Sequence, residues 1–147
     1  MKLPKNFEEY LTKGVIKKCS INKSRAEFLI EESEKSLRGL KKRIDIMEID
    51  DDNANSIIKD CYDILMELIR AKLLLDGYNS SGQFAHEAEV SYLKKLGFSD
   101  YEVGFINDLR YFRNSINYYG KILSVEYAKQ VSNFTNKIYP KLKRMVR

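Results

Sequence analysis

Apolar residues spaced three and four apart run through residues 53–76, and this periodicity constrains the fold more than any other feature of the chain. Its apolar positions are Ile57, Ile58, Cys61, Ile64, Leu65, Leu68, Ile69, Leu73, Leu74 and Leu75. So wide an apolar surface predicts a helix that is buried on more than one side, either at the centre of a bundle or in a dimer interface. Only two prolines and seven glycines occur in 147 residues, which also favours long helices over strands and turns.

Capping residues and glycines delimit further helices around this central one. A brief helix is expected to end at Gly14, and a long helix is expected to begin with a capping box from Ser24 to Glu27. A third helix covers about 83–96. A fourth begins with a second capping box, from Ser99 to Glu102, and ends near Gly120, and a fifth begins after Ser124.

Short connections complete this outline of the fold. The segments "VIKKCSI" and "YNSSGQ" are read as a connector and a loop, and Pro140 is expected to kink the last helix or end it early. The chain is therefore predicted to be all-α, an up-and-down bundle of four to five helices. Residues 1–21 form an N-terminal extension with a short helix, and residues 22–147 form the bundle.

Positive charge lies at both ends of the chain. Residues 1–25 carry a net charge of +5 and residues 127–147 a net charge of +6, whereas residues 26–126 carry −6. The basic ends are expected to contact an anionic partner, to cover the acidic middle of a second subunit, or only to keep the protein soluble. Cys19 and Cys61 belong to no metal-binding motif. Because the first residues lack an apolar signal core and no apolar run is long enough for a membrane, a cytoplasmic protein without membrane contact is expected.

A polar strip on the fourth helix, within "NDLRYFRNSINYYG", is the most unusual feature of the sequence. At helical spacing Leu109, Phe112, Ile116 and Tyr119 share a face that is expected to pack on the core. Arg110, Arg113, Asn114 and Asn117 follow beside that face, and Tyr118 lies farther round the helix. Arginine and asparagine donors can bind phosphate, and tyrosine can stack on a base. The alternative is that Arg113 forms an ion pair with an acid of the central helix at residues 53–76, namely Asp60, Asp63 or Glu67.

The stretch "FINDLRYFRNSINYYGK", with "LLLDGYNSSGQFAHEAEVSYLKKLGFSDYE" before it, resembles the HEPN domain family, and the resemblance extends over about residues 22–145. It implies a small helical bundle that forms a homodimer. Many HEPN proteins are metal-independent ribonucleases, often toxins paired with a minimal nucleotidyltransferase antitoxin, and others bind RNA or nucleotides without cleaving them. The family motif is an Arg, then four to six residues of which the first is commonly polar, and then a His. Arg113 and Asn114 match its beginning.

The histidine of that motif is missing, because Tyr118, Tyr119 and Gly120 occupy the positions where it would fall. Histidine exchanges protons near neutral pH with a pKa of about 6.5, whereas tyrosine has a pKa of about 10. The departure favours binding over cleavage, through Arg110, Arg113, Asn114, Asn117, Tyr118 and Tyr119.

Two further functions remain open: a ribonuclease in which Tyr118 or His86 transfers the proton, and a partner-binding subunit for a nucleotidyltransferase. His86, early in the third helix, is expected near the C-terminal half of the fourth helix. Alternatively it caps its own helix or bonds a backbone carbonyl. No Glu-x-x-His pair, P-loop or dinucleotide-binding motif occurs, so neither a metal nor another cofactor is expected.

Overall fold

The computed structural model of the chain describes residues 2–120 and 122–147, so Met1 and Lys121, which closes the stretch quoted above, lie outside the described residues. The described residues form six helices and a sheet of two strands. In chain order these elements are α1 (Phe7–Thr12), β1 (Ile16–Lys18), α2 (Lys23–Met47), α3 (Ala54–Leu75), β2 (Tyr78–Ser80), α4 (Ala85–Lys95), α5 (Asp100–Tyr119) and α6 (Val125–Val146). None of the described helices is long and apolar enough to cross a membrane.

Helix α3 is the centre of the fold. It packs against α2, α4, α5 and α6, and its buried side chains, such as Met66, Cys61 and Ala71, cover more than half of its circumference. The mainly helical class predicted from the sequence is therefore confirmed, and the wide apolar surface of residues 53–76 is core. The free energy that favours this arrangement comes from removing the wide apolar surface of α3 from water, while Asp60, Asp63 and Glu67 occupy its remaining, less buried side.

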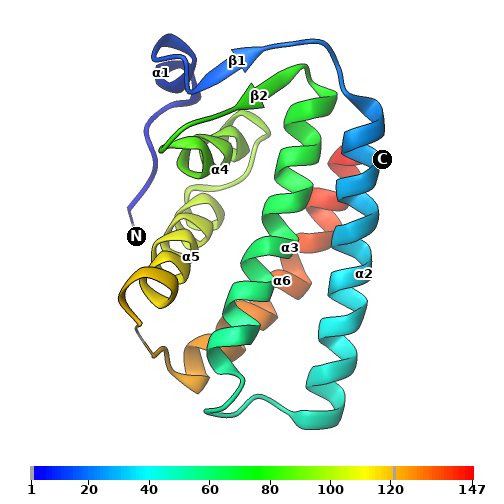
Figure 1. Cartoon of the computed structure of the whole chain (residues 1–147), viewed down its shortest axis with the longest axis vertical. Helices are drawn as coiled ribbons and strands as arrows, with labels where there is room; N and C mark the ends of the chain where they lie inside the picture. Colours follow the sequence, from blue (N-terminus) through cyan, green and yellow to red (C-terminus); the bar gives the residue numbers. More distant parts are fainter. Residues whose placement is uncertain (1, 121) are drawn as a thin grey trace.

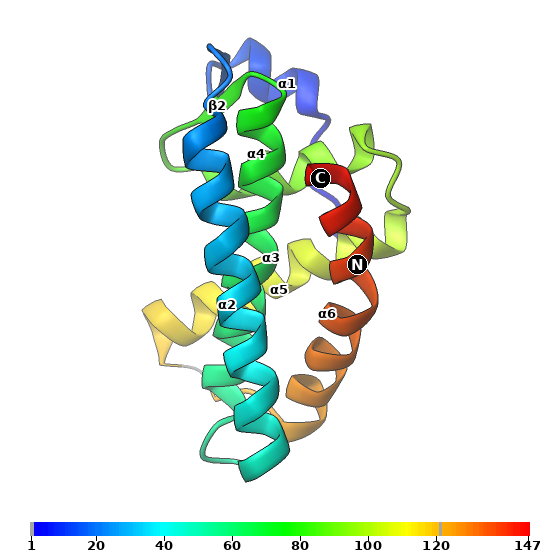
Figure 2. The same cartoon turned by 90° about the vertical axis from the view of Figure 1, so that its right-hand side faces the viewer.

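The order of the helices in space differs from a simple up-and-down bundle. Helix α2 runs antiparallel to α3, but α6 runs alongside α3 in the same direction (Figure 1). This is possible because α5 runs across α3 and carries the chain back to the end where α3 begins (Figure 2). The up-and-down prediction is wrong for α4 to α6, since short loops fix which helices are consecutive but not the angle at which they cross.

Two of the three predicted helix starts are confirmed. The Ser99 hydroxyl accepts from the Glu102 amide at 3.1 Å while the Glu102 carboxylate accepts from the Ser99 amide at 2.9 Å, and the Ser124 hydroxyl accepts from the Tyr127 amide at 3.1 Å. The capping box at Ser24 is wrong, because α2 begins at Lys23 and the Asn22 side chain caps it by accepting from the Arg25 amide at 3.1 Å. Asn22 is as good a cap as serine and lies two residues earlier.

A small antiparallel sheet replaces the connector and the loop that the sequence suggested. Strands β1 and β2 pair so that Ile16 lies opposite Ser80 and Lys18 opposite Tyr78. Three residues are too few for an alternating apolar pattern to be recognised, and the two strands are far apart in sequence. The sequence of these two segments therefore does not predict strands, and their pairing depends on the tertiary fold.

The N-terminal extension is part of the packed structure. Its buried side chains Phe7, Tyr10 and Ile16 form a second hydrophobic cluster, separate from the main core. Their partners on α3 and α4 are Leu73, Ala88 and Tyr92. The described part of the extension thus packs α1 and β1 onto α3 and α4, the helices that carry part of the candidate site described below.

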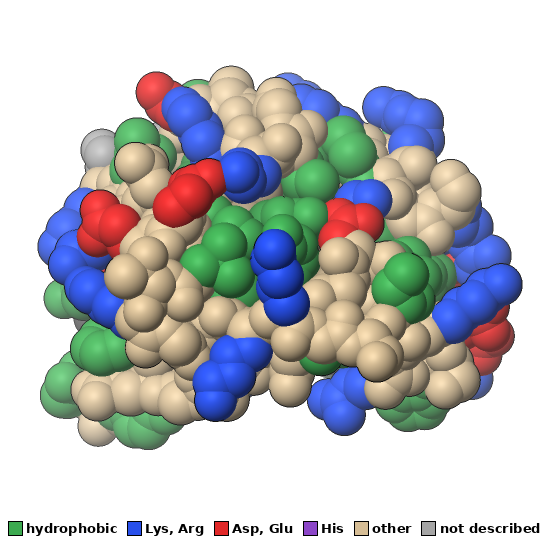
Figure 3. Space-filling view, turned by 90° about the horizontal axis from the view of Figure 1, so that it is seen from above, with side chains coloured by type: hydrophobic (Ala, Val, Ile, Leu, Met, Phe, Trp, Pro, Cys, Tyr) green, Lys and Arg blue, Asp and Glu red, His purple; other side chains and the backbone are tan. Residues whose placement is uncertain are grey.

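The basic C-terminal turn of α6 is partly neutralised within the chain. Glu34 of α2 pairs with Lys143 and with Arg147 at 2.5 and 2.8 Å, and Glu102 pairs with Lys141 at 3.0 Å. The end of the molecule that carries the two strands shows hydrophobic side chains in its middle, with more Lys and Arg than Asp and Glu around them (Figure 3). Ion pairs within the chain therefore neutralise part of the positive charge of residues 127–147.

Helix α6 continues through Pro140 to Val146, so of the two expected outcomes, a kink or an early end, the early end does not occur. Pro140 lacks an amide hydrogen and leaves the Asn136 carbonyl without its helical donor. Both residues are exposed, so water can satisfy that carbonyl and the helix need not end.

Candidate functional site

Two cavities meet at His86 on α4. The first, called the arginine pocket, has a volume of about 360 Å³. Its lining includes Phe84, His86, Glu87, Arg110, Arg113, Asn114 and Tyr118. The second, called the α2–α3 groove, has a volume of about 560 Å³, and Gly39 of α2, Glu67 and Arg70 of α3 and His86 are among its lining residues. Both volumes lie in the range of small-molecule sites, and His86 connects the two.

The structure brings most of the predicted strip into the arginine pocket. Arg110, Arg113, Asn114 and Tyr118 line it together with His86, which lies near the C-terminal half of α5 as expected. Asn117 and Tyr119 are exposed and are not among its lining residues. The expectation that Tyr119 packs on the core is wrong, because its side chain is 84% exposed. Gly120 ends α5 one residue later, and the end of this helix extends beyond its neighbours (Figure 2).

Arg113 forms the ion pair with the second long helix that the alternative reading anticipated. Its Nη2 atom lies 3.4 Å from Oδ1 of Asp63, and its guanidinium lies over the Tyr62 ring at 5.5 Å from the ring centre. Its buried Nε atom has no hydrogen-bond partner among the described residues. The Asp63 side chain is 54% exposed, so this long ion pair holds Arg113 weakly and leaves guanidinium donors for a ligand.

Arg110 is held more firmly than Arg113. Its Nε atom donates to Oδ1 of Asn107 at 3.1 Å, and Asn107 in turn donates to the backbone carbonyl of Lys2 at 3.1 Å. Nη2 of Arg110 lies 3.6 Å from Oε1 of Glu87. The pocket therefore contains two arginines, each with a carboxylate nearby, so that a bound anion must compete with Asp63 and Glu87.

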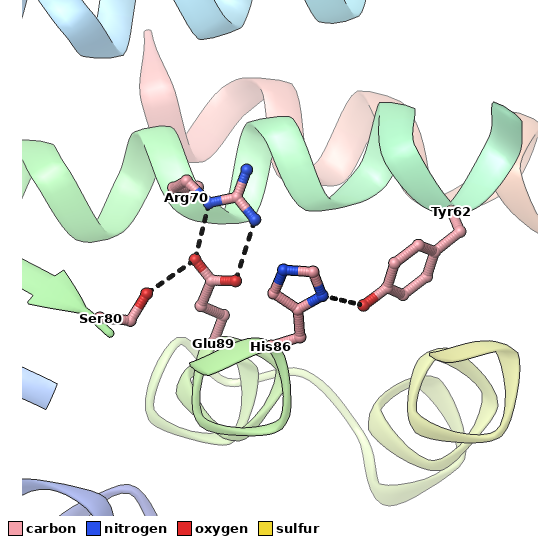
Figure 4. Close-up of polar contacts among 5 residues, drawn as sticks. All are labelled: Tyr62, Arg70, Ser80, His86 and Glu89. Carbon is pink, nitrogen blue, oxygen red and sulfur yellow. Dashed lines mark hydrogen bonds and ion pairs between the residues drawn. The ribbon is translucent and has the colours of Figure 1, made fainter. Parts of the chain in front are cut away.

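His86 is placed by a contact that the sequence did not suggest. Its Nδ1 atom lies 3.3 Å from the hydroxyl of the buried Tyr62, so within the described part of the chain its partner is a side chain of α3. Figure 4 shows His86 and Glu89 projecting from α4 towards α3, where Tyr62 and Arg70 lie. Burial lowers the pKa of His86 below its usual 6.5, and Arg70 and Arg113 add to the shift against the opposing effect of Glu89 and Asp63. The imidazole is accordingly neutral at pH 7.

A buried ion pair stands beside His86 and orients α4 on α3. Arg70 donates to both carboxylate oxygens of Glu89, at 2.8 and 3.0 Å, and the Ser80 hydroxyl donates to the same carboxylate at 3.0 Å (Figure 4). Glu89 is only 1% exposed. Sequence reasoning missed this pair. A charged residue among apolar neighbours in each helix was the only local signal, and it does not identify the partner.

Glu67 is the other ionisable group of the groove that stands out. It makes no hydrogen bond or ion pair with the residues that the structure describes, whereas Asp63 and Arg70, one turn away on α3, each form an ion pair. Burial, together with the nearby carboxylates of Asp63 and Glu32, raises the pKa of Glu67 to about 7 against the opposing effect of Arg70. The sequence suggested Glu67 only as one of three possible partners for Arg113, a role that Asp63 takes.

Replacing Glu67 with glutamine is expected to make the protein more stable at pH 8 but not at pH 4.5. The folded state holds the Glu67 proton more tightly than the unfolded chain, so ionisation destabilises the fold progressively as pH rises from 4.5 to about 7. Because the group is half-buried and screened, the gain in Glu67→Gln at pH 8 should be about 1–2 kcal/mol. Urea unfolding of both proteins at the two pH values measures it, and an equal difference at both would contradict this explanation.

Comparison with known proteins does not assign the chain to a family. No protein-family model matches it, and no curated protein and no solved structure is significantly similar to it. Within the described residues no group of three or more His, Cys, Asp or Glu side chains is arranged to hold a metal ion. The resemblance to HEPN domains thus rests on the residues quoted from the sequence.

Proposed function

We propose that this chain is a HEPN-like module that binds RNA or nucleotide phosphate in the arginine pocket without cleaving it. The observation that carries the proposal is the convergence of Arg110, Arg113, Asn114 and Tyr118 of α5 with His86 of α4 around one cavity of about 360 Å³. Convergent polar donors in a cavity of this size are the usual mark of a ligand site. The four residues of α5 were selected from the sequence because their chemistry suits a phosphate or a base.

Each residue has a role that follows from its position. Arg113 supplies guanidinium donors that match phosphate oxygens, and the Tyr62 ring beneath it holds the guanidinium in place. Asn114 adds an amide donor beside it, and the exposed ring of Tyr118 is free to stack on a base. Arg110, fixed by Asn107 and Glu87, contributes positive charge more than a movable donor.

A phosphate bound by Arg113 displaces Asp63, since the two anions compete for the same guanidinium. The half-exposed Asp63 can turn away into solvent at little cost because its ion pair with Arg113 is long. Phosphate affinity is therefore set by the difference between two interactions and not by the arginine alone. This makes Asp63 a sensitive reporter of whether the ligand uses Arg113.

The second candidate function is a metal-independent ribonuclease, and the position of His86 favours it. His86 shares the arginine pocket with Arg113 and is neutral at pH 7, the form in which an imidazole accepts a proton from a 2′-hydroxyl. It would take the place of the motif histidine, which this chain lacks at positions 118–120. Prolonged incubation of labelled RNA with wild type and His86→Ala separates the candidates, because only a ribonuclease gives cleavage that His86→Ala abolishes.

Replacing Arg113 with alanine is expected to weaken binding of a short single-stranded RNA by about tenfold or more, since a hydrogen bond to a charged group contributes about 1.5–3 kcal/mol. The salt dependence of binding should also fall, because fewer phosphates are neutralised. Fluorescence anisotropy at two salt concentrations measures both effects.

Two matched variants make this experiment specific. Arg38→Ala removes an exposed arginine of α2 that lines neither cavity and should bind like wild type. Asp63→Asn removes the internal competitor and should bind more tightly than wild type. Equal affinities for wild type, Arg113→Ala and Asp63→Asn would show that the arginine pocket is not where RNA binds.

A further inference from the structure

We propose that the α2–α3 groove is a nucleobase subsite that selects guanine, next to the phosphate subsite in the arginine pocket. This inference rests on the proposed function and names the ligand that the combined site takes. It assigns a role to the larger of the two cavities, which the phosphate contacts leave empty.

The position of the groove follows from the shared residue. His86 lines both cavities, and Asp63 in the groove touches Arg113 in the pocket at 3.4 Å. A nucleotide whose phosphate lies at Arg113 therefore has the groove within reach of its sugar and base. The groove's volume of about 560 Å³ is large enough for a nucleoside.

The chemistry of the groove follows from which of its charges are already paired. Arg43 donates to Asp60 at 2.7 Å, Arg70 is bound by the buried carboxylate of Glu89, and Asp63 is paired with Arg113. Glu67, which lines the same groove, has no such partner among the described residues. When phosphate displaces the half-exposed Asp63 from Arg113, that side chain turns into solvent, and the base in the groove meets the two acceptor oxygens of Glu67.

Guanine is the base whose edge fits a carboxylate best. Its N1–H and N2 amino group are adjacent donors, and they can bond to both oxygens of Glu67 at once. Uracil presents a single N–H between two carbonyl oxygens, which a carboxylate repels. Adenine and cytosine present an amino group next to an acceptor nitrogen, so they satisfy only one oxygen. The neighbouring Arg70 guanidinium faces the same groove and suits the guanine O6 acceptor.

Gly39 makes the inference testable without removing a charge. It lies on the wall of the groove within α2, and a Cβ atom built on it meets no heavy atom within 4 Å. Gly39→Phe is expected to fold and to fill the groove with its ring, whereas Gly39→Ala adds one methyl group and leaves the groove open. The alanine variant is therefore the matched control for the phenylalanine variant.

Calorimetric titration of the full chain at pH 8, where Glu67 is ionised, tests the proposal with GMP, UMP and inorganic phosphate as probes. Wild type and Gly39→Ala should bind GMP about five- to tenfold more tightly than UMP, as expected for a pair of charge-assisted hydrogen bonds. Gly39→Phe should reduce GMP affinity to the level of UMP and leave inorganic phosphate binding unchanged. Glu67→Gln should lose the preference for GMP while keeping an open groove, so it tests the same inference if Gly39→Phe does not fold.

The possible results separate the two proposals. If wild type binds all three probes but GMP and UMP equally, the guanine subsite is wrong and phosphate binding in the arginine pocket stands. If GMP is preferred and both Gly39→Phe and Glu67→Gln keep that preference, the base is read elsewhere and the subsite is again wrong. If none of the three probes binds, both the subsite and the proposed function are overturned.

Discussion

Replacing Arg70 with methionine should destabilise the protein by about 3–5 kcal/mol, the largest effect expected from any single polar substitution in this chain. Arg70 supplies two hydrogen bonds to Glu89, whose carboxylate is 1% exposed. Without Arg70 that carboxylate either stays charged and unpaired in the interior or takes up a proton, and both alternatives are costly. Urea unfolding at pH 7, followed by the circular dichroism of the helices, measures the loss.

The double variant Arg70→Met with Glu89→Leu is the control for this interpretation. It removes both charges, so most of the lost stability should return, because a buried ion pair contributes little more than apolar packing of the same volume. A double variant that is less stable than Arg70→Met alone would show that Glu89 stabilises the fold without Arg70. In that case its hydrogen bond from Ser80 would be the important one.

Replacing Phe7 with alanine should destabilise the protein by about 3–5 kcal/mol, although Phe7 lies outside the bundle predicted from the sequence. Its side chain is 2% exposed and contacts the rings of Tyr78 and Tyr92, with ring centres 5.2 and 4.7 Å away. Removing it leaves a cavity between α1, β2 and α4. Thermal or urea unfolding measures the change in the free energy of unfolding.

Phe28→Ala is the matched control for Phe7→Ala, because the Phe28 side chain on α2 is 60% exposed. It should alter stability by less than about 0.5 kcal/mol. If Phe7→Ala also has so small an effect, the extension unfolds before the bundle and contributes little to global stability. Hydrogen exchange of the α1 amides tests that reading directly, since local unfolding would leave them unprotected in the wild type as well.

Local patterns were sufficient for the helices and for the direction in which the polar strip points. The repeat of apolar residues from Ile57 to Leu75 predicts a buried helix because one backbone periodicity places them on the surfaces that pack. The capping box at Ser99 and the glycine at position 120 are likewise signals contained within a few residues. For the same reason Arg110, Arg113 and Asn114 were correctly placed together beside the core face of α5.

Contacts between distant segments were decided only by the tertiary structure. The pairing of β1 with β2, the crossing of α5 over α3 and the burial of Glu89 against Arg70 join residues that no local pattern relates. Tyr119 shows the limit within a single helix, since periodicity gives it the core direction but no neighbouring helix extends far enough to cover it.

Some features of the candidate site could likewise be predicted from the sequence, and others could not. The sequence by itself determined which side chains of α5 have the chemistry for phosphate, because residue type and helical phase are local properties. Only the tertiary structure decided that Asp63 is the acid that pairs with Arg113, that His86 joins two cavities, and that Glu67 is left unpaired in the larger one. The physical reason is that pairing and burial depend on the distances between helices, which are set by how the whole core packs.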